Sequence, residues 1–296
     1  MHRSDRGASG KGCGPSRARD CRRVYRGRLG RGVIVVRIAV AAALAALVAL
    51  GAWRARALTA SGAAAAAIIG TAIFAAGAWS FAAVLFAFFL PAVALSRFGS
   101  KRKAAIADTD KRKARDARQV LANGGVAAAC AVAYAFTRSP ALAAAFAGAF
   151  AAAAADTWGT ELGTLARGAP RSIVNFRTIA RGLSGGVTLA GTLAEIGGAL
   201  AVGLVTWAAG ITPWWIVAAA GFAGALADSV FGATLQALRY CGSCGRLCET
   251  DPHLCGSSTS LVRGWGAIDN DAVNAIATIT GAVAAGWIAS LYTAAF

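Results

Sequence analysis

Charged residues are scarce in this sequence. They make up 15% of its 296 residues, whereas Asp, Glu, Lys and Arg form about a quarter of a typical soluble domain. Apolar residues reach 57%, and the mean hydropathy is +0.58. This composition excludes an ordinary soluble globular protein. It predicts an all-α, polytopic transmembrane bundle of about 7–8 helices.

Acidic residues and histidines are few. Lys and Arg outnumber Asp and Glu by 30 to 13, but the basic residues lie in an N-terminal tail and in loops, and no nucleic-acid-binding motif is present. We therefore expect no nucleic acid partner, and we interpret the charge as a topology signal that can also meet anionic ligands or lipids. No nucleophile–base pair for acyl transfer stands out, and neither His2 nor His253 is placed for that chemistry.

Apolar stretches alternate with short polar segments along most of the chain. Alanine and the 36 glycines supply much of their content, so we expect the helices to pack closely. We expect a disordered basic tail at residues 1–32, where the start site could be assigned too early, and one transmembrane catalytic domain at residues 33–296. The predicted helices cover residues 33–53, 58–77, 79–96, 119–137, 140–166, 184–208, 212–237 and 268–294.

Three loops, residues 97–118, 167–183 and 238–267, are separated by pairs of predicted helices and therefore share one face. The first carries nine Lys and Arg, so the positive-inside rule places this face in the cytoplasm of a multi-pass cell-membrane protein. Eight spans then leave the basic tail outside, against the same rule. Either one of the first three spans is not a crossing, or the tail is absent from the mature protein.

The segment Ala151–Leu165 begins as an apolar helix and then places several polar side chains within about two turns. Charge inside a membrane segment usually faces a cavity, a partner or a ligand. Asp156 and Thr160 stack one turn apart, and Gly159 with Gly163 forms a GxxxG step that admits a neighbouring helix. The alternative is that these acids sit at the helix end and pair with nearby arginines.

Acids near the loop ends of the predicted helices suggest a magnesium site. The segment Ala155–Thr157 resembles Ala227–Ser229, and this short internal repeat pairs Asp156 with Asp228. Several carboxylates together hold Mg²⁺ with waters and substrate phosphates. Glu195 lies deeper, where a structural hydrogen bond or an Arg partner is an equal alternative. The predicted catalytic residues are Asp156, Glu161, Asp228 and Asp271, with Asp156 and Asp228 as magnesium ligands.

A basic, Gly-rich segment precedes one of the predicted helices. Small residues expose backbone N–H groups at a helix N-terminus, which forms an anion site, and arginines add bidentate contacts to phosphate. The last predicted helix opens with an amide-rich turn that is longer than capping requires, although Asp271 itself could be a cap. The predicted phosphate- or substrate-binding residues are Arg171, Arg181, Ser184, Gly185, Gly186, Asn270 and Asn274.

Four cysteines cluster in the loop at residues 238–267. A CxxC pair followed by His-x-Cys supplies four ligands for structural zinc, namely Cys241, Cys244, His253 and Cys255. Cys248 could replace His253. The alternative is a set of reduced thiols without a metal.

Several motifs together resemble a known family: ADTWGTELG, PRSI with SGGVTLAGTLA, ADSVFGATLQ, CxxC with ETxxHxCG, and NDxVN. They resemble the integral-membrane family called domain of unknown function 92, which includes the plant phytyl-phosphate kinase. The resemblance covers about residues 40–294. It implies a kinase of isoprenoid metabolism that converts a prenyl monophosphate to the diphosphate with a nucleoside triphosphate, CTP being one candidate.

Two other functions fit the same residues. A nucleotidyltransferase acting on a lipid phosphate would use the same metal and basic groups and release pyrophosphate. A proton- or ion-coupled transporter would use the paired acids as ion sites, although such sites usually lie near the membrane midplane. A non-catalytic scaffold that docks through the cysteine loop is a further class.

Overall fold

The structure is a computed structural model that describes residues 15–99 and 114–295, with side chains from residue 34 onward. The chain divides into two units, residues 1–40 and 41–296. Helix α1 (Pro15–Arg54) begins in the first unit and ends in the second. Residues 15–32 of the predicted tail belong to α1, and the first 14 residues lie outside the described part of the chain.

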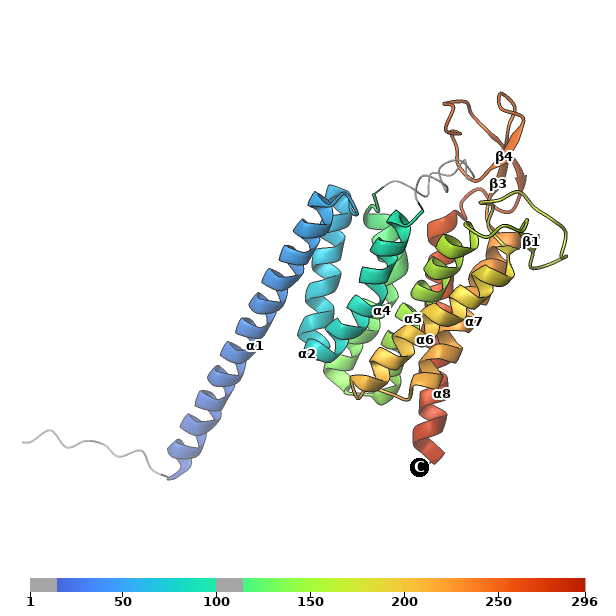
Figure 1. Ribbon diagram of the computed structural model, residues 1–296. Coiled ribbons are helices and arrows are strands. Elements are labelled where there is room, and N and C mark those ends of the chain that lie inside the picture. Colours follow the sequence, from blue (N-terminus) through green and yellow to red (C-terminus); the bar gives the residue numbers. More distant parts are fainter. Residues whose placement is uncertain (1–14, 100–113, 296) are drawn as a thin grey trace, which may run out of the picture. The chain divides into compact units, whose positions relative to one another are not determined.

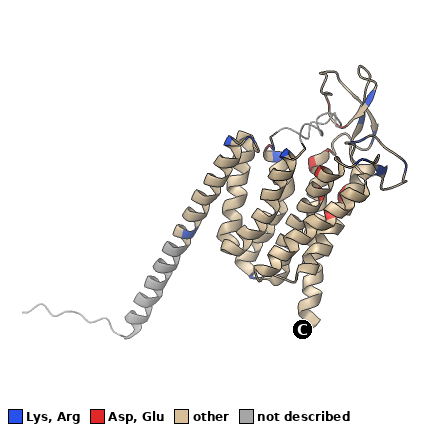
Figure 2. Cartoon of the chain, in the orientation of Figure 1, with Lys and Arg blue, Asp and Glu red and all other residues tan. Residues whose placement is uncertain are grey.

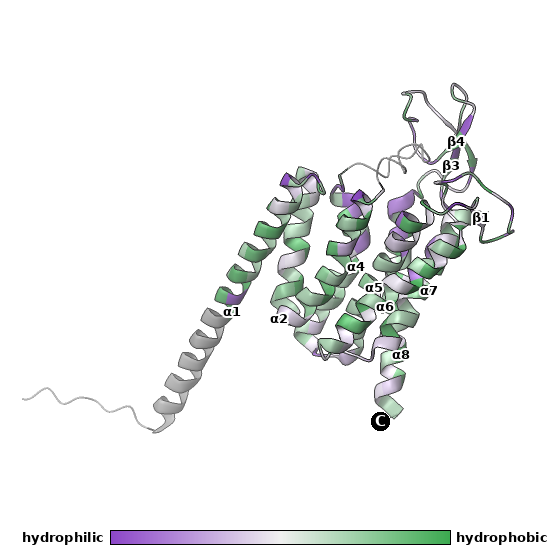
Figure 3. Cartoon of the chain, viewed as in Figure 1, coloured by the Kyte–Doolittle hydropathy of each residue, from purple (hydrophilic) through white to green (hydrophobic). Residues whose placement is uncertain are grey.

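Helices dominate the second unit (Figure 1). In the described residues, seven helices are long and apolar enough to cross a membrane, which confirms the predicted all-α membrane bundle. Figure 3 shows apolar residues along the helices and polar residues gathered at one end. After α1 come α2 (Ala60–Arg97), α4 (Ala117–Thr137), α5 (Pro140–Gly163), α6 (Leu189–Ala208), α7 (Trp214–Thr234) and α8 (Asn270–Ala295).

Helix α2 folds back on itself as two arms that meet at Ala78. A straight helix of its 38 residues would be about 57 Å long, far more than the ~30 Å apolar core of a bilayer. At Ala78 the backbone leaves the helical region (φ 51°, ψ −137°), and Phe81 packs against Gly77, where a Cβ would overlap its ring. Arg97 Nη2 donates to Ala55 O at 2.6 Å, so the chain has folded back. The predicted stretches 58–77 and 79–96 correspond to these two arms.

Helix α5 is the centre of the bundle, with 15 of its 24 residues buried. Glycines allow its neighbours to approach: a Cβ on Gly148 would lie 2.3 Å from Gly281 O in α8, and a Cβ on Gly221 in α7 would lie 2.6 Å from Ala151 Cβ. On the α2 side, the rings of Phe81 and Phe146 stack at 4.1 Å. The predicted close packing of Ala- and Gly-rich helices is therefore observed.

The longer connecting loops gather at one end of the helices, which we call the loop face (residues 55–59, 114–116, 164–188 and 235–269). Thr59 N bonds Arg115 O at 3.0 Å, and Arg118 Nη2 bonds Asp269 Oδ2 at 2.7 Å. Ser184 N bonds Glu249 Oε1 at 2.6 Å. These contacts join the three predicted loops, so they do share one face.

The loop face also carries short strands that the sequence did not suggest. β1 (Arg171–Ser172) pairs antiparallel with β2 (Gly186–Val187). β3 (Leu238–Cys241), β4 (Arg246–Cys248) and β5 (Ser260–Arg263) form an antiparallel sheet in the order β4-β3-β5. The two sheets lie beyond the helix ends (Figure 1) and shape the loops around the site described below.

Candidate functional site

A polar pocket of about 430 Å³ opens among the helix ends at the loop face. Acidic residues of the helices are concentrated at this end (Figure 2). Most of the predicted site residues line the pocket: Asp156, Glu161, Arg181, Ser184, Gly185, Gly186, Asp228, Asn270 and Asn274. Residues from α5, α6, α7, α8 and the loop before α6 therefore meet in one place.

The α5 wall of the pocket has the predicted stacked pair. Thr160 Oγ1 donates to Asp156 Oδ1 at 3.5 Å. Arg115 also lines the pocket; burial lowers its pKa, while the negative charges of Glu161 and Asp156 act in the opposite direction. The guanidinium thus lies within the electrostatic reach of both acids. Its backbone is fixed by hydrogen bonds to Ala57 and Thr59.

Glu195 brings a further carboxylate from α6 to the same wall. It is 8% exposed, lines the pocket, and its Oε2 has no hydrogen-bond partner in the described residues. A Cβ on Gly159 would lie 2.5 Å from Glu195 Cγ, so the first glycine of the GxxxG step makes room for this side chain. The second, Gly163, packs close to Gly191 of α6. The predicted close helix approach is therefore confirmed, and its position beside an acid was not anticipated.

The opposite wall comes from α7 and α8. Asp228 and Ser229 line the pocket from α7, and Asn270 and Asn274 line it from α8. Carboxylate and amide oxygens of this kind suit a hard cation such as Mg²⁺. The donor set therefore fits the predicted metal without involving sulfur or imidazole ligands.

Two predicted site residues lie away from the pocket. Asp271 points to Arg118, with 4.0 Å between Oδ2 and Nε, because the first turn of α8 faces the start of α4. Arg171 is exposed in β1, and its Nη1 approaches Phe176 O at 3.5 Å. Neither residue is among those lining the pocket, although Arg171 lies in the strand that pairs with Gly186–Val187 and Asp271 directly follows Asn270, which lines it.

The Gly-rich segment before α6 is held by a partner from the cysteine loop. The carboxylate of Glu249 accepts from Ser184 N at 2.6 Å, from Ser184 Oγ at 3.0 Å and from Gln236 Nε2 at 2.9 Å. The backbone N–H of Ser184, which we predicted to donate a hydrogen bond to a phosphate, therefore already donates to the Glu249 carboxylate. Gly185 has φ +79°, and a Cβ there would lie 2.4 Å from Ala233 Cβ, so this turn requires glycine.

Arg181 supports the same loop. Its Nη2 donates to the backbone oxygens of Arg167 at 2.6 Å and Gly168 at 3.1 Å. The predicted helix at residues 184–208 begins only at Leu189, where Thr188 caps it by accepting from Gly191 N at 3.0 Å. Residues 181–188 therefore border the pocket as an ordered loop.

The predicted zinc ligands form a compact cluster. The ligand atoms of Cys241, Cys244, His253 and Cys255 all lie within 4.8 Å of one another. Cys241 and Cys255 sulfurs are 3.6 Å apart, and Cys244 Sγ is 3.5 Å from His253 Nδ1. Ligands on a tetrahedral zinc are separated by about 3.5–3.8 Å, so the cluster fits a metal ion.

Hydrogen bonding within this cluster separates the thiol pKa values. Bonds from Ser257 and His253 lower the pKa of Cys255 to about 5, whereas the bond with Cys255 raises the pKa of Cys244 to about 12. Cys248 lies apart, with its Sγ 3.7 Å from Thr250 O. The sequence left two alternatives for the fourth ligand, His253 and Cys248. The structure places His253, and not Cys248, with the other three ligand atoms.

Comparison with known proteins identifies the family. The family model for integral membrane protein DUF92 matches residues 43–282. The chain belongs to this family. Among DUF92-like relatives, Protein PGR of Arabidopsis thaliana is 28% identical over 276 residues, covering 82% of this chain and 93% of that protein. This agrees with the resemblance seen in the sequence motifs.

Two further relatives are uncharacterized membrane proteins. The one from Methanocaldococcus jannaschii is 32% identical and covers 68% of this chain and 72% of its own length. The one from Synechocystis is 31% identical and covers 57% of this chain and 68% of its own length. No solved structure matches the chain.

Proposed function

We propose that this protein is a membrane kinase that phosphorylates a prenyl monophosphate to the diphosphate with a nucleoside triphosphate. The observation that supports it is one pocket at the ends of membrane helices that combines acids, arginines and an ordered Gly-rich loop. Lipid phosphates present their head groups at this depth while their chains remain in the membrane. The family resemblance implies the same activity.

The reaction requires positioning rather than a strong base. A phosphate monoester has a second pKa of about 6 and is mostly ionised at neutral pH. One of its oxygens attacks the γ-phosphorus of the nucleotide, a new P–O bond forms, and the bond to the bridging oxygen of the β-phosphate breaks. The nucleoside diphosphate leaves, and no proton has to be removed from the attacking oxygen.

The chain's own groups divide this work. Mg²⁺ held by Asp156, Asp228 and Glu195 would neutralise charge on the nucleotide phosphates. Arg115 would bind the lipid phosphate, since it lines the pocket and its guanidinium lies within the electrostatic reach of Glu161 and Asp156. Glu161 would hold Arg115 in position, and Asn270 and Asn274 would orient bound oxygens.

The cysteine cluster would have a structural role. All four candidate ligands come from the protein, which is typical of a closed zinc site. Zinc would order the loop that carries Glu249 and thereby the Gly-rich segment bound to it. By the positive-inside rule, the basic loop face lies in the cytoplasm, where nucleotides are available.

The test is product formation by purified protein in detergent with Mg²⁺, geranylgeranyl monophosphate and each nucleoside triphosphate in turn. We expect a prenyl diphosphate by mass spectrometry, and a loss of at least 100-fold in Asp156→Asn and Glu195→Gln. A nucleotidyl-lipid would instead identify a nucleotidyltransferase. No lipid product from folded protein with any donor would reject both enzymes and favour transport, despite the position of the acids at the loop face (Figure 2).

A further inference from the structure

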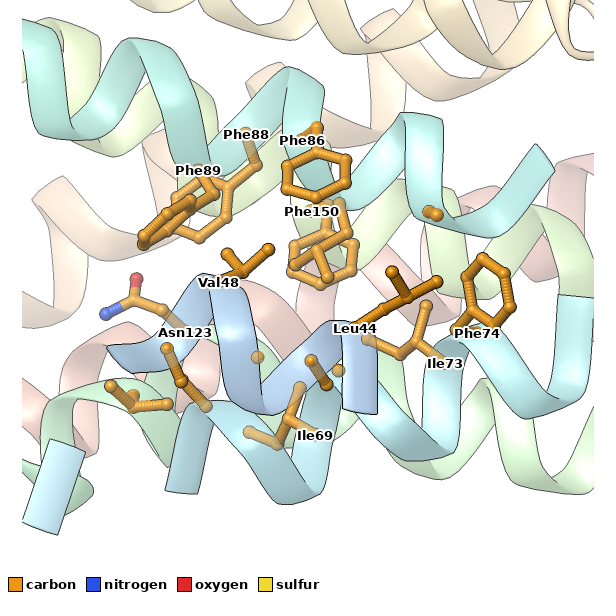
Figure 4. A pocket seen from close by; sticks show the side chains of 18 of the residues that line it. Leu44, Val48, Ile69, Ile73, Phe74, Phe86, Phe88, Phe89, Asn123 and Phe150 are labelled. Carbon is orange, nitrogen blue, oxygen red and sulfur yellow. The ribbon is translucent and has the colours of Figure 1, made fainter. Parts of the chain in front are cut away.

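A second cavity, almost entirely apolar, lies inside the membrane part of the bundle. It has a volume of about 170 Å³, is lined by residues of α1, α2, α4 and α5, and is partly open to the outside of the bundle at Trp79. All its lining residues belong to the unit 41–296. Rings of Phe86, Phe88, Phe89 and Phe150 surround it (Figure 4). An apolar cavity of this kind takes a hydrocarbon group rather than water.

This cavity meets the polar pocket. Arg115, Gln119 and Asn123 line both. Figure 4 shows the amide of Asn123 at one end of the apolar cavity and Phe74 at the other. Along the first arm of α2, before Ala78, the lining runs from Ala66 to Phe74, which is about 12 Å at 1.5 Å per residue. The cavity is thus elongated, with its polar end at the proposed phosphate site.

We propose that this cavity holds the hydrocarbon chain of the lipid phosphate, with the carbons nearest the phosphate beside Asn123 and Gly124. The inference rests on the proposed function, since it takes the polar pocket as the phosphate site. An apolar cavity of about 150 Å³ accommodates benzene, so this cavity encloses a segment of about six carbons. Contacts in this cavity, rather than contacts on the lipid-facing surface, then determine which lipid monophosphate the protein accepts as substrate.

Adjacent glycines in α4 provide a matched test. Gly124 lines the cavity, and a Cβ there would lie 3.4 Å from Ile69 Cδ1 and 4.0 Å from Phe150, which are ordinary contacts. Gly125 does not line it, and its Cβ would meet only Leu121 Cδ2, at 3.9 Å. Leucine at position 124 would fill the cavity, whereas leucine at position 125 would not.

The experiment compares wild type, Gly124→Leu and Gly125→Leu in the kinase assay with geranylgeranyl monophosphate. We expect Gly124→Leu to raise the KM for the lipid at least tenfold, equivalent to about 1.4 kcal/mol, while the KM for the nucleotide changes less than twofold. Gly125→Leu should change neither constant more than twofold. Equal lipid KM values for both variants, in active protein, would overturn the cavity assignment while leaving the kinase intact.

A photoaffinity measurement covers the case in which Gly124→Leu does not fold. Wild-type protein is irradiated with farnesyl monophosphate that carries a diazirine on the chain, and labelled peptides are mapped. Labels on cavity residues of α2, α4 or α5, competed by geranylgeranyl monophosphate, support the assignment. Labels confined to lipid-facing residues such as Ile68 overturn it. If the wild-type protein forms no prenyl diphosphate, the proposed function is wrong, and the assignment of the lipid chain to the cavity is rejected with it.

Discussion

Glu249 joins two loops that are far apart in the sequence, and replacing it tests whether this connection matters. Its carboxylate accepts three hydrogen bonds, from Ser184 N, Ser184 Oγ and Gln236 Nε2, between 2.6 and 3.0 Å. The Glu249→Ala variant removes the acceptor for all three donors. Ser184 is half-buried, so its amide does not fully regain a water partner.

The expected cost follows from these contacts. A hydrogen bond to a charged group contributes about 1.5–3 kcal/mol. Because Ser184 and Gln236 can partly re-solvate, we expect a loss of about 2 kcal/mol in the free energy of local opening of the Gly-rich loop. At 1.4 kcal/mol per tenfold, this corresponds to roughly 30-fold faster amide exchange when reclosing of the loop is fast compared with the chemical exchange step.

Hydrogen exchange of the peptide that spans residues 183–188 is the assay. Wild type should protect the Ser184 amide, and Glu249→Ala should exchange it about 30-fold faster. Ser184→Ala, which keeps the backbone bond but loses the hydroxyl bond, should have a smaller effect, and it completes a double-mutant cycle together with the double variant Ser184→Ala/Glu249→Ala. Exchange within twofold of wild type in Glu249→Ala would show that the connection contributes nothing and would refute the reasoning.

Four other predictions follow from named contacts. Purified protein should contain one zinc per chain by elemental analysis, and Cys255→Ser should lose it; full retention in that variant would contradict the ligand set. Gly148→Ala, whose Cβ would lie 2.3 Å from Gly281 O, should destabilise the bundle by about 1–3 kcal/mol in thermal or denaturant unfolding, whereas Gly125→Ala should not; equal stabilities would contradict the close α5–α8 contact. Arg115→Gln should raise the lipid KM about tenfold by removing a charge-assisted contact, and an unchanged KM would exclude a phosphate-binding role. Asp271→Asn should retain activity within about fivefold, since this carboxylate faces Arg118; a loss as large as that of Asp156→Asn would return it to the catalytic set.

Much of the fold could be predicted because a membrane helix can be recognised from the composition of its own residues. Apolar runs located the spans, including both arms of α2. The pairs of predicted helices between the three loops indicated a common face, in agreement with the contacts Arg118–Asp269 and Ser184–Glu249. The pairs Asp156–Thr160 and Gly159–Gly163 followed from helical spacing. The ligand set of the cysteine cluster could be predicted from the CxxC and HxC spacing, since the two residues of each pair lie close together in the sequence.

Long-range contacts were the part that sequence reasoning missed. Arg115 was interpreted only as a topology charge, although a bridge to Leu58 fixes its backbone at the pocket. Glu195 was left undecided because nothing local reveals that Gly159 makes space for it. Glu249 lies in the cysteine loop, and its contact with Ser184 was missed because the two residues are 65 positions apart in the sequence. Asp271 was assigned to the site from its position at the start of the last predicted helix, and Arg171 from its place in the basic, Gly-rich segment. In the structure Asp271 faces Arg118, Arg171 approaches Phe176 O, and neither lines the pocket.

The most direct test of the proposed kinase is the fate of the nucleotide phosphates. Purified protein would be given geranylgeranyl monophosphate, Mg²⁺ and a nucleoside triphosphate labelled with ³²P at either the α or the γ position. The account predicts that γ-label enters the prenyl diphosphate and that α-label stays in the released nucleoside diphosphate, with Asp156→Asn transferring neither. Transfer of the α-label to lipid, or no transfer from folded wild type, would contradict it.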